Sequence, residues 1–244
     1  MITQYIWFLL LALLAEIIGT VSGFGSSILF VPIASLYFDF TSVLGITAVF
    51  HVFSNLSKIA LFRNGINRPI ALKLGIPAVV MVLIGALLTH FLPTPTLELA
   101  MTIVVLALAV FLILFFKKPL PQSNFNLYSG GALSGLIAGV AGTGGAIRGL
   151  TLAAFQLPKD IFIATSALID LGVDAARAGV YMYYGYFHQQ FIPLIPFLLG
   201  ISLLGSYIGK RIIAHTSETV FRYLVLIVIV ATSIFHLVKY FYHS

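Results

Sequence analysis

Apolar segments long enough to cross a lipid bilayer follow one another along almost the whole chain. A helix needs about 20 apolar residues to span a membrane. The clearest segments of this length are Ser42–Phe62, Ala71–Phe91, Thr96–Phe116, Ile161–Tyr183, Phe191–Gly209 and Thr219–Phe241. Only 8% of the 244 residues are charged, whereas soluble domains carry about 25%, so the charges are too few to cover a surface that faces water. We therefore predict an all-α, polytopic membrane protein.

The charge balance and the cysteine count exclude several classes of protein. Lys and Arg outnumber Asp and Glu by 13 to 7, for a net charge of +6, and most of the basic residues lie in the predicted loops. This distribution fits loops beside anionic lipid, and it forms no basic stripe of the kind that binds nucleic acid. The chain contains no cysteine and no HExxH spacing, so we expect no nucleic-acid partner, no disulfide, no metal site and no other cofactor.

Two further apolar stretches are too long for a single span, and glycines interrupt both of them. The first, Tyr5–Tyr37, is broken at residues 23–27, and the second, Tyr128–Leu157, is broken at residues 142–145. Because glycine is a poor helix former, we expect a helix to stop at each break and another to begin after it. We predict that each stretch forms a helical hairpin that enters and leaves the membrane on the same side.

The two glycine breaks belong to two halves of the chain that resemble each other. At an offset of 119 residues, Gly23 and Gly25 align with Gly142 and Gly144. The same offset aligns three polar residues of each half, namely His51, Asn55 and Lys58 with Asp170, Asp174 and Arg177. We predict an internal duplication, with a first membrane repeat at residues 1–118, a linker at 119–127 and a second repeat at 128–244.

The distribution of basic residues over the loops predicts how the halves are oriented, because cytoplasmic loops carry an excess of Lys and Arg. If the broken stretches are hairpins, nine basic residues share one side and Lys239 is alone on the other. With eight single spans, the split is only six to four. The nine residues are Arg63, Arg68, Lys73, Lys117, Lys118, Lys159, Lys210, Arg211 and Arg222. The hairpin arrangement is therefore favoured.

In the hairpin arrangement each half has five membrane segments, an odd number, so the second half is inverted relative to the first. We therefore predict two inverted repeats, each made of a glycine-broken helical hairpin and three transmembrane helices. Inverted repeats around a site at the membrane midplane are the architecture of many secondary transporters.

The glycine breaks are also candidates for a binding site. Unwound backbone inside a membrane is tolerated where it is buried in protein or lines a cavity. A helix that begins after a break points free N–H groups at that place, which favours an anion. The candidate substrate contacts at the breaks are Ser22, Gly23, Gly25, Ser26, Ser27, Gly142, Thr143, Gly144 and Gly145. The alternative is that glycines only let helices pack closely, which the pairs Gly19 with Gly23 and Gly135 with Gly139 also fit.

The aligned polar residues form two more candidate groups. Each group has the spacing i, i+4, i+7 and therefore shares one face of a helix. Ionisable groups inside a membrane are costly and usually face a cavity or one another. We predict substrate contacts at Asn55 and Arg177, and coupling or gating roles for His51, Lys58, Asp170 and Asp174.

Simpler roles stay open for several of these residues. Asp174 and Arg177 could neutralise each other, Asn55 could form an interhelical hydrogen bond, and Lys58 could extend its amine to the headgroups. Two carboxylates one helical turn apart resist being ionised together. We therefore expect Asp170 to be the carboxyl that titrates and Asp174 to be the partner of Arg177.

Arg148 lies on the helix that begins after the second break. A guanidinium group can bind two oxygens of a tetrahedral or pyramidal oxyanion at once. We predict that Arg148 contacts the substrate, while an ion pair with Glu16 or Asp170 stays open as the alternative. Glu16 itself is either a structural partner or a proton carrier.

With these motifs the sequence resembles the TauE/SafE family of sulfite and sulfonate exporters, a two-repeat family of bacterial and archaeal membrane carriers. The resemblance covers nearly the whole chain. Its motifs are Gly23-Phe24-Gly25-Ser26-Ser27-Ile28, followed by Pro32, and Gly142-Thr143-Gly144-Gly145-Ala146-Ile147. The first half departs from the family's glycine-richer pattern at Ser26-Ser27, and the second has Thr151 where the first has Pro32.

The resemblance implies a multi-pass secondary transporter in the plasma (inner) membrane of a prokaryote. Such a protein is no enzyme, and it exports sulfite or related sulfur oxyanions and organosulfonates by alternating access. An anion channel with the same site chemistry stays open, as do proton coupling and a homodimer. An intramembrane serine protease is the weakest alternative, because it requires a GxSG turn and the nearest sequence, Gly19–Gly23, is one residue too long.

Overall fold

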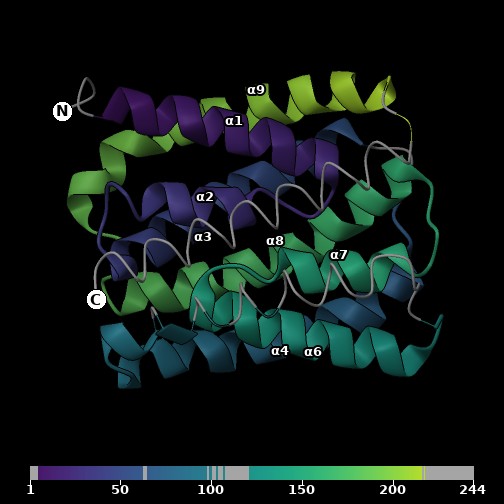
Figure 1. Cartoon of the computed structure of the whole chain (residues 1–244), viewed down its shortest axis with the longest axis horizontal. Helices are drawn as coiled ribbons and strands as arrows, with labels where there is room; N and C mark the ends of the chain where they lie inside the picture. Colours follow the sequence, from purple (N-terminus) through teal and green to yellow (C-terminus); the bar gives the residue numbers. More distant parts are fainter. Residues whose placement is uncertain are drawn as a thin grey trace.

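The structure is a computed structural model, and it describes residues 5–62, 65–97, 99–100, 103, 107, 121–215 and 217. Within these ranges the chain is helical and contains no strand, which confirms the all-α prediction for this part of the molecule. Figure 1 shows the helices α1 (Ile6–Ser22), α2 (Ser27–Ala34), α3 (Phe40–Leu61), α4 (Arg68–Phe91), α6 (Asn124–Ala141), α7 (Gly145–Ala153), α8 (Lys159–Tyr183) and α9 (Ile195–Ala214), and a short 3₁₀ helix, η2 (Gln189–Leu194).

Three segments of the described chain are long and apolar enough to cross a membrane. They are α3, α4 and the continuous segment Gln189–Ala214, which joins η2 to α9. Helix α8 has 25 residues but also carries charged residues in its middle. On the outer face of α4, the residues Leu72, Ile76 and Val80 are each 52–60% exposed. Such an apolar face fits contact with lipid.

Some of the predicted segments cannot be compared with the structure. The predicted span 219–241 and most of the span 96–116 lie outside the described residues, as do Arg63, Lys117, Lys118, Arg222 and Lys239. The predicted linker 119–127 ends inside a helix. Helix α6 begins at Asn124 because the hydroxyl of Ser123 accepts a hydrogen bond from the backbone N–H of Asn126 and caps the helix.

The chain reverses direction at each glycine break. In the first half, Tyr5 stacks on Phe38 with ring centroids 5.3 Å apart, and Phe8 meets Phe30 at 5.6 Å, so the chain after α1 returns along α1. In the second half, α7 packs along α6 in the same way. Helices α1 and α6 end at Gly23 and Gly142, whose φ angles of 71° and 73° are left-handed, a conformation that glycine adopts without strain.

The helices pack in pairs. Helix α1 packs against α9 and α6 packs against α4, while α3 and α8 lie side by side in the middle (Figure 1). Helices α3 and α8 run in opposite directions. Gly45, near the start of α3, contacts Tyr186 beyond the end of α8, and the N–H of Asn67, beyond α3, donates to Thr165 near the start of α8.

Glycines outside the breaks bring the paired helices together. Gly135 and Gly139 of α6 lie against the backbone of α4 at Ala78 and Val82, where a side chain would collide with a carbonyl group. Gly19 of α1 lies in the same way against the backbone of Ser26. For these three glycines the close-packing alternative is therefore the one that the structure supports.

Candidate functional site

The two glycine breaks meet near the middle of the molecule. Gly145, the first residue of α7, lies directly against the backbone carbonyl of Phe24 in the first break. The hydroxyls of Ser27 and Thr143 lie 3.4 Å apart across the same contact. Segments more than a hundred residues apart in the sequence are thus joined where both helices are interrupted, as a single central site requires.

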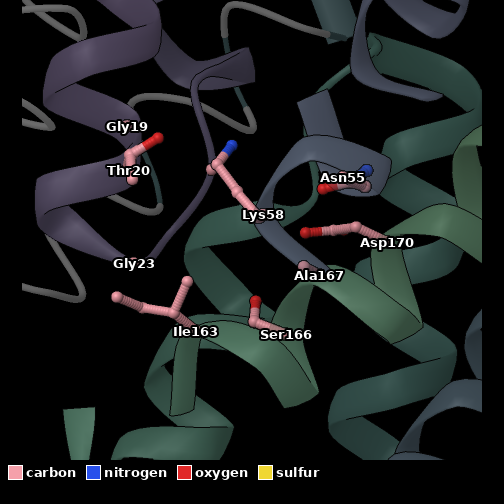
Figure 2. Close-up of a pocket in the computed structure, with 10 residues that line it drawn as sticks. Gly19, Thr20, Gly23, Asn55, Lys58, Ile163, Ser166, Ala167 and Asp170 are labelled. Carbon is pink, nitrogen blue, oxygen red and sulfur yellow. The ribbon is translucent and has the colours of Figure 1, made fainter. Parts of the chain in front are cut away.

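A small cavity lies beside this contact (Figure 2). Its volume is about 10 Å³, which is room for about one water molecule. Residues of the first break region, α3 and α8 line it, namely Gly19, Thr20, Gly23, Gly25, Asn55, Lys58, Ile163, Ser166, Ala167 and Asp170. Five of these residues are ones that the sequence predicts for the site, namely Gly23, Gly25, Asn55, Lys58 and Asp170.

Arg148 of α7 is buried next to both breaks. Its side chain is 3% exposed and forms an ion pair with the Asp170 carboxylate, while its Nε donates to the Ser166 hydroxyl at 3.2 Å. A Cβ atom on Gly25 would lie 3.8 Å from the guanidinium, and one on Gly145 would lie 3.3 Å from it. Of the two ion pairs that the sequence left open, the structure contains the one with Asp170.

Glu16 of α1 lies at the centre of a second buried polar cluster, which we call the Glu16 cluster. The Lys58 amine lies 2.9 Å from its carboxylate. The carboxylate also accepts hydrogen bonds from Ser26 at 2.5 Å, from Ser54 at 2.7 Å and from Ser206 of α9 at 2.9 Å. Lys58 is 4% exposed, so it does not extend to the headgroups. Instead its charge is neutralised inside the molecule.

Asn55 and Asp174 form a hydrogen bond between α3 and α8, and these are two positions that the predicted offset aligns. The Asn55 amide donates to Asp174 at 2.7 Å, and the two residues are 119 positions apart. Asp174 also forms an ion pair with Arg177 at 2.7 Å. Arg177 donates in addition to the carbonyl of Ala138 at 3.1 Å, near the end of α6. The predicted pairing of Asp174 with Arg177 is therefore present.

The model of the family "Sulfite exporter TauE/SafE" matches residues 8–235 of the chain. The chain belongs to the TauE/SafE family. This family membership, together with the apolar helices, makes the chain a multi-pass membrane protein of a transporter family whose activity is the export of sulfite. Comparisons with curated proteins and with solved structures gave no match.

Within this TauE/SafE protein, several predicted site residues lie away from the cavity. The Ser22 hydroxyl donates to the carbonyl of Gly19 at 3.1 Å, at the end of α1. Gly142 lies near Leu44, and Gly144 lies against Ser134 of α6. Ser27 and Thr143 meet each other. Contacts of these residues with a substrate stay predictions. In the structure they contact residues of the breaks and of the neighbouring helices.

His51 also has defined partners outside the cavity lining. Its Nδ1 lies 2.7 Å from the carbonyl of Thr47, one turn earlier in α3, and its Nε2 lies 3.0 Å from the Ser26 hydroxyl. The imidazole is 4% exposed and packs edge-on against Phe30 and Phe50. His51 is therefore connected to the Glu16 cluster through Ser26.

Three serines that the sequence prediction did not include complete these networks. Ser54 and Ser206 bind Glu16, and Ser166 binds Arg148. Ser54 and Ser166 each lie one turn before a predicted residue, Lys58 and Asp170 respectively, so their helical spacing was an available signal. Nothing comparable marks Ser206, which lies on α9. In the part of the chain that the structure describes, no group of three or more His, Cys, Asp or Glu residues could hold a metal ion.

Proposed function

We propose that this protein is a secondary transporter that moves small oxyanions, with sulfite and related sulfur compounds as the substrate class. The observation that carries the proposal is the position of Arg148. Its buried guanidinium adjoins both glycine breaks and pairs with an aspartate that lines a cavity. A buried guanidinium favours an anion with two or more oxygens, because its fork donates two parallel hydrogen bonds.

Binding of such an anion requires the cavity to open. The cavity has room for about one water molecule, whereas sulfite contains four atoms other than hydrogen. In this conformation the Asp170 carboxylate is bound to the Arg148 guanidinium. An incoming oxyanion therefore competes with Asp170 for the same guanidinium. We propose that Asp170 then moves aside and takes up a proton, since a displaced carboxylate would otherwise stay ionised beside a second negative charge.

The proposed mechanism is alternating access between two inverted repeats. Three observations support the repeats: the left-handed glycines at equivalent positions, the corresponding helix pairs, and the Asn55–Asp174 hydrogen bond between equivalent residues. If the two repeats exchange conformations, the contact between the breaks opens to one side of the membrane and then to the other. We place the protein in the inner membrane of a prokaryote.

The topology is tested by labelling of single cysteines with a reagent that does not cross membranes. The chain has no cysteine of its own, so each introduced cysteine reports one position. We expect labels near Lys159 and Lys210 to be cytoplasmic and a label near Gln189 to be external. A label at position 159 that reacts from outside would contradict the inverted arrangement.

The function is tested by flux into proteoliposomes with sulfite, thiosulfate, sulfate and an organosulfonate, each with and without a pH gradient. We expect saturable flux of at least one of these anions. Flux that stays linear with concentration and follows the voltage would instead indicate a channel, and flux of none of them would contradict the proposed substrate class.

Arg148→Lys is the variant that tests the site. A lysine keeps the charge but loses the planar fork, so we expect the apparent affinity to fall about tenfold, equivalent to about 1.4 kcal/mol. Arg211→Lys is the matched control, because Arg211 is exposed and donates to the hydroxyl of Tyr207. Equal transport by both variants would place the anion site elsewhere.

A further inference from the structure

A single hydroxyl group, that of Ser26, lies between two buried titratable side chains. Its Oγ is 2.5 Å from the Glu16 carboxylate and 3.0 Å from Nε2 of His51. Glu16 and Ser26 are 0% exposed and His51 is 4% exposed. Both distances are those of hydrogen bonds, so each contact needs a proton between its two heavy atoms.

Counting protons along this chain of contacts shows that one more is present than an ionised Glu16, the Ser26 hydroxyl and a neutral His51 supply. Nδ1 of His51 carries a proton, because its partner at 2.7 Å is the carbonyl of Thr47, which can only accept. The Ser26 hydroxyl has one proton and can donate it to Glu16 or to His51, but not to both. The remaining contact needs a proton that belongs either to Nε2 of His51 or to the Glu16 carboxyl.

We propose that Glu16, Ser26 and His51 form a proton-binding relay that is separate from the Arg148–Asp170 pair. The relay holds one exchangeable proton in two forms. In one form Glu16 is ionised and His51 is an imidazolium. In the other, His51 has passed the Nε2 proton to the Ser26 oxygen, Ser26 has passed its own proton to Glu16, and the imidazole and carboxyl are neutral.

The charged groups around the relay make its occupancy sensitive to an anion. Lys58 of α3 lies 2.9 Å from Glu16, and Asp174 and Arg177 of α8 face His51 as a mutually neutralised pair. Helix α2 brings no charged residue. On α9, Ser206 is the residue that reaches Glu16, while the Lys210 amine donates to the carbonyl of Leu61. With its proton, the group formed by the relay and Lys58 has a net charge of +1, and without it the net charge is zero.

The relay adjoins the proposed anion site through the first glycine break. Ser26 precedes α2 and follows Gly25, the residue that faces the Arg148 guanidinium. An anion at that place favours the proton-loaded relay by charge attraction, and by linkage the loaded relay favours the anion to the same extent. This coupling rests on the proposed transport function, whereas the presence of the proton does not.

The proton itself is tested by magnetic resonance on the full-length protein in detergent, without a substrate. Of the three glutamates, Glu98 and Glu218 can be replaced by glutamine, so that ¹³C-glutamate reports Glu16 alone, and ¹⁵N-histidine signals of His51 are assigned by their loss in His51→Gln. Near neutral pH we expect either both His51 nitrogens protonated or Glu16 protonated. Ser26→Ala should show neither, with Glu16 ionised and His51 neutral.

Ser57→Ala is the matched control, because Ser57 is a buried serine of α3 that bonds Phe53 and Ser202 outside the relay. It should keep the extra proton. A wild-type protein with ionised Glu16 and an unprotonated Nε2 on His51 would overturn the relay. So would an extra proton that persists in Ser26→Ala.

The coupling is tested by calorimetric titration with sulfate in two buffers that differ in ionisation enthalpy. The titration is made at a pH above neutral, at which the resonance signals show that the relay of the anion-free protein has lost its extra proton. We expect proton uptake with binding in wild type and Ser57→Ala, and an uptake lower by about one proton per anion in Ser26→Ala. Equal uptake in all three proteins would overturn the coupling. If sulfate binds to none of them while the resonance signals are as expected, the choice of substrate in the proposed function fails and the proton site stands.

Discussion

The two buried polar clusters beside the cavity have different arrangements. In the Glu16 cluster, a fully buried carboxylate is held by Lys58 and by three serines from different parts of the chain. Across the cavity, Arg148 pairs with Asp170, whose side chain is 13% exposed and lines the cavity. A charge with many fixed donors is costly to move, whereas a charge with a single ionic partner at a cavity wall is free to exchange that partner.

This difference fits the proposal that the two clusters bind different ligands. At the predicted offset of 119 residues the aligned side chains differ: His51 aligns with Asp170, and Lys58 aligns with Arg177. The proton of the proposed relay therefore has its site in the Glu16 cluster. The proposed anion has its site at Arg148, where the displaced Asp170 takes up a second proton. The following predictions test whether the two clusters are separate in this way.

The largest effect is expected where the two breaks touch. In Gly145→Ala the added Cβ collides with the carbonyl of Phe24, so the breaks must separate and Arg148 must shift. Overpacking of this kind costs about 1–3 kcal/mol, and a displacement of about 1 Å at a site can cost about a hundredfold in rate. We expect flux to fall by about that factor, with a lower thermal midpoint in detergent.

Gly179→Ala is the control for this prediction, since no atom lies within 4 Å of a Cβ placed at Gly179 of α8. It should leave flux and thermal midpoint unchanged. If Gly145→Ala transports as well as Gly179→Ala, contact between the breaks is not needed, and the anion site does not depend on both halves.

At Asp170 the expected effect on the anion is smaller and of opposite sign. In Asp170→Asn the carboxylate that competes for Arg148 is removed, and Arg148 is left buried without its partner. An unpaired buried charge destabilises the fold by about 3–5 kcal/mol. We therefore expect a lower thermal midpoint without anion, and a rise of about tenfold in apparent anion affinity, seen as a larger stabilisation by added sulfate than in wild type.

Asp160→Asn provides the control, because Asp160 lies exposed in the first turn of the same helix. Its stabilisation by sulfate should equal that of wild type. If sulfate does not stabilise Asp170→Asn more than wild type, Asp170 and the anion do not compete, and the contrast between an exchangeable pair and a fixed cluster is wrong.

The sequence predicts the elements that depend on local structure. Helix α1 ends at the first glycine break and α6 ends at the second. The left-handed Gly23 and Gly142 at these ends are aligned by the predicted offset. The pairing of Asp174 with Arg177 is equally local, because three residues separate them on one helix.

The partners of Glu16 could not be predicted, because they depend on how distant helices pack. Ser206 is 190 positions away from Glu16, and a serine in a membrane helix more often donates to its own backbone. The role of Lys58 was ambiguous for the same reason. Its position near a helix end fits an amine that reaches the headgroups. Only the packing of both α1 and α3 against α9 brings Glu16 within 2.9 Å of the amine.

The smallest effect is expected at the start of α3, where the capping residue differs from the aligned residue before α8. Asp39 caps α3, accepting from the backbone N–H of Ser42 at 3.1 Å and from the Thr41 hydroxyl at 2.6 Å. The equivalent position before α8 is Pro158, which makes no side-chain cap. Partial burial disfavours the Asp39 carboxylate, but the hydrogen bonds from Ser42 and Thr41 outweigh it and hold its pKa below the ordinary value.

Asp39→Ala should therefore destabilise the protein by about 1 kcal/mol near neutral pH, the usual cost of losing such a cap. Because the folded-state pKa is lowered, the carboxylate contributes its stability above the pKa of the unfolded chain, about 3.9, and loses it as pH falls through the folded value. The difference in thermal midpoint between wild type and Asp39→Ala should shrink on acidification below about pH 4. Asp39→Asn keeps a capping oxygen without the charge, so it should retain most of the stability but not its pH dependence. Equal midpoints for Asp39→Ala and Asp39→Asn would show that the cap contributes nothing at this end of the first half.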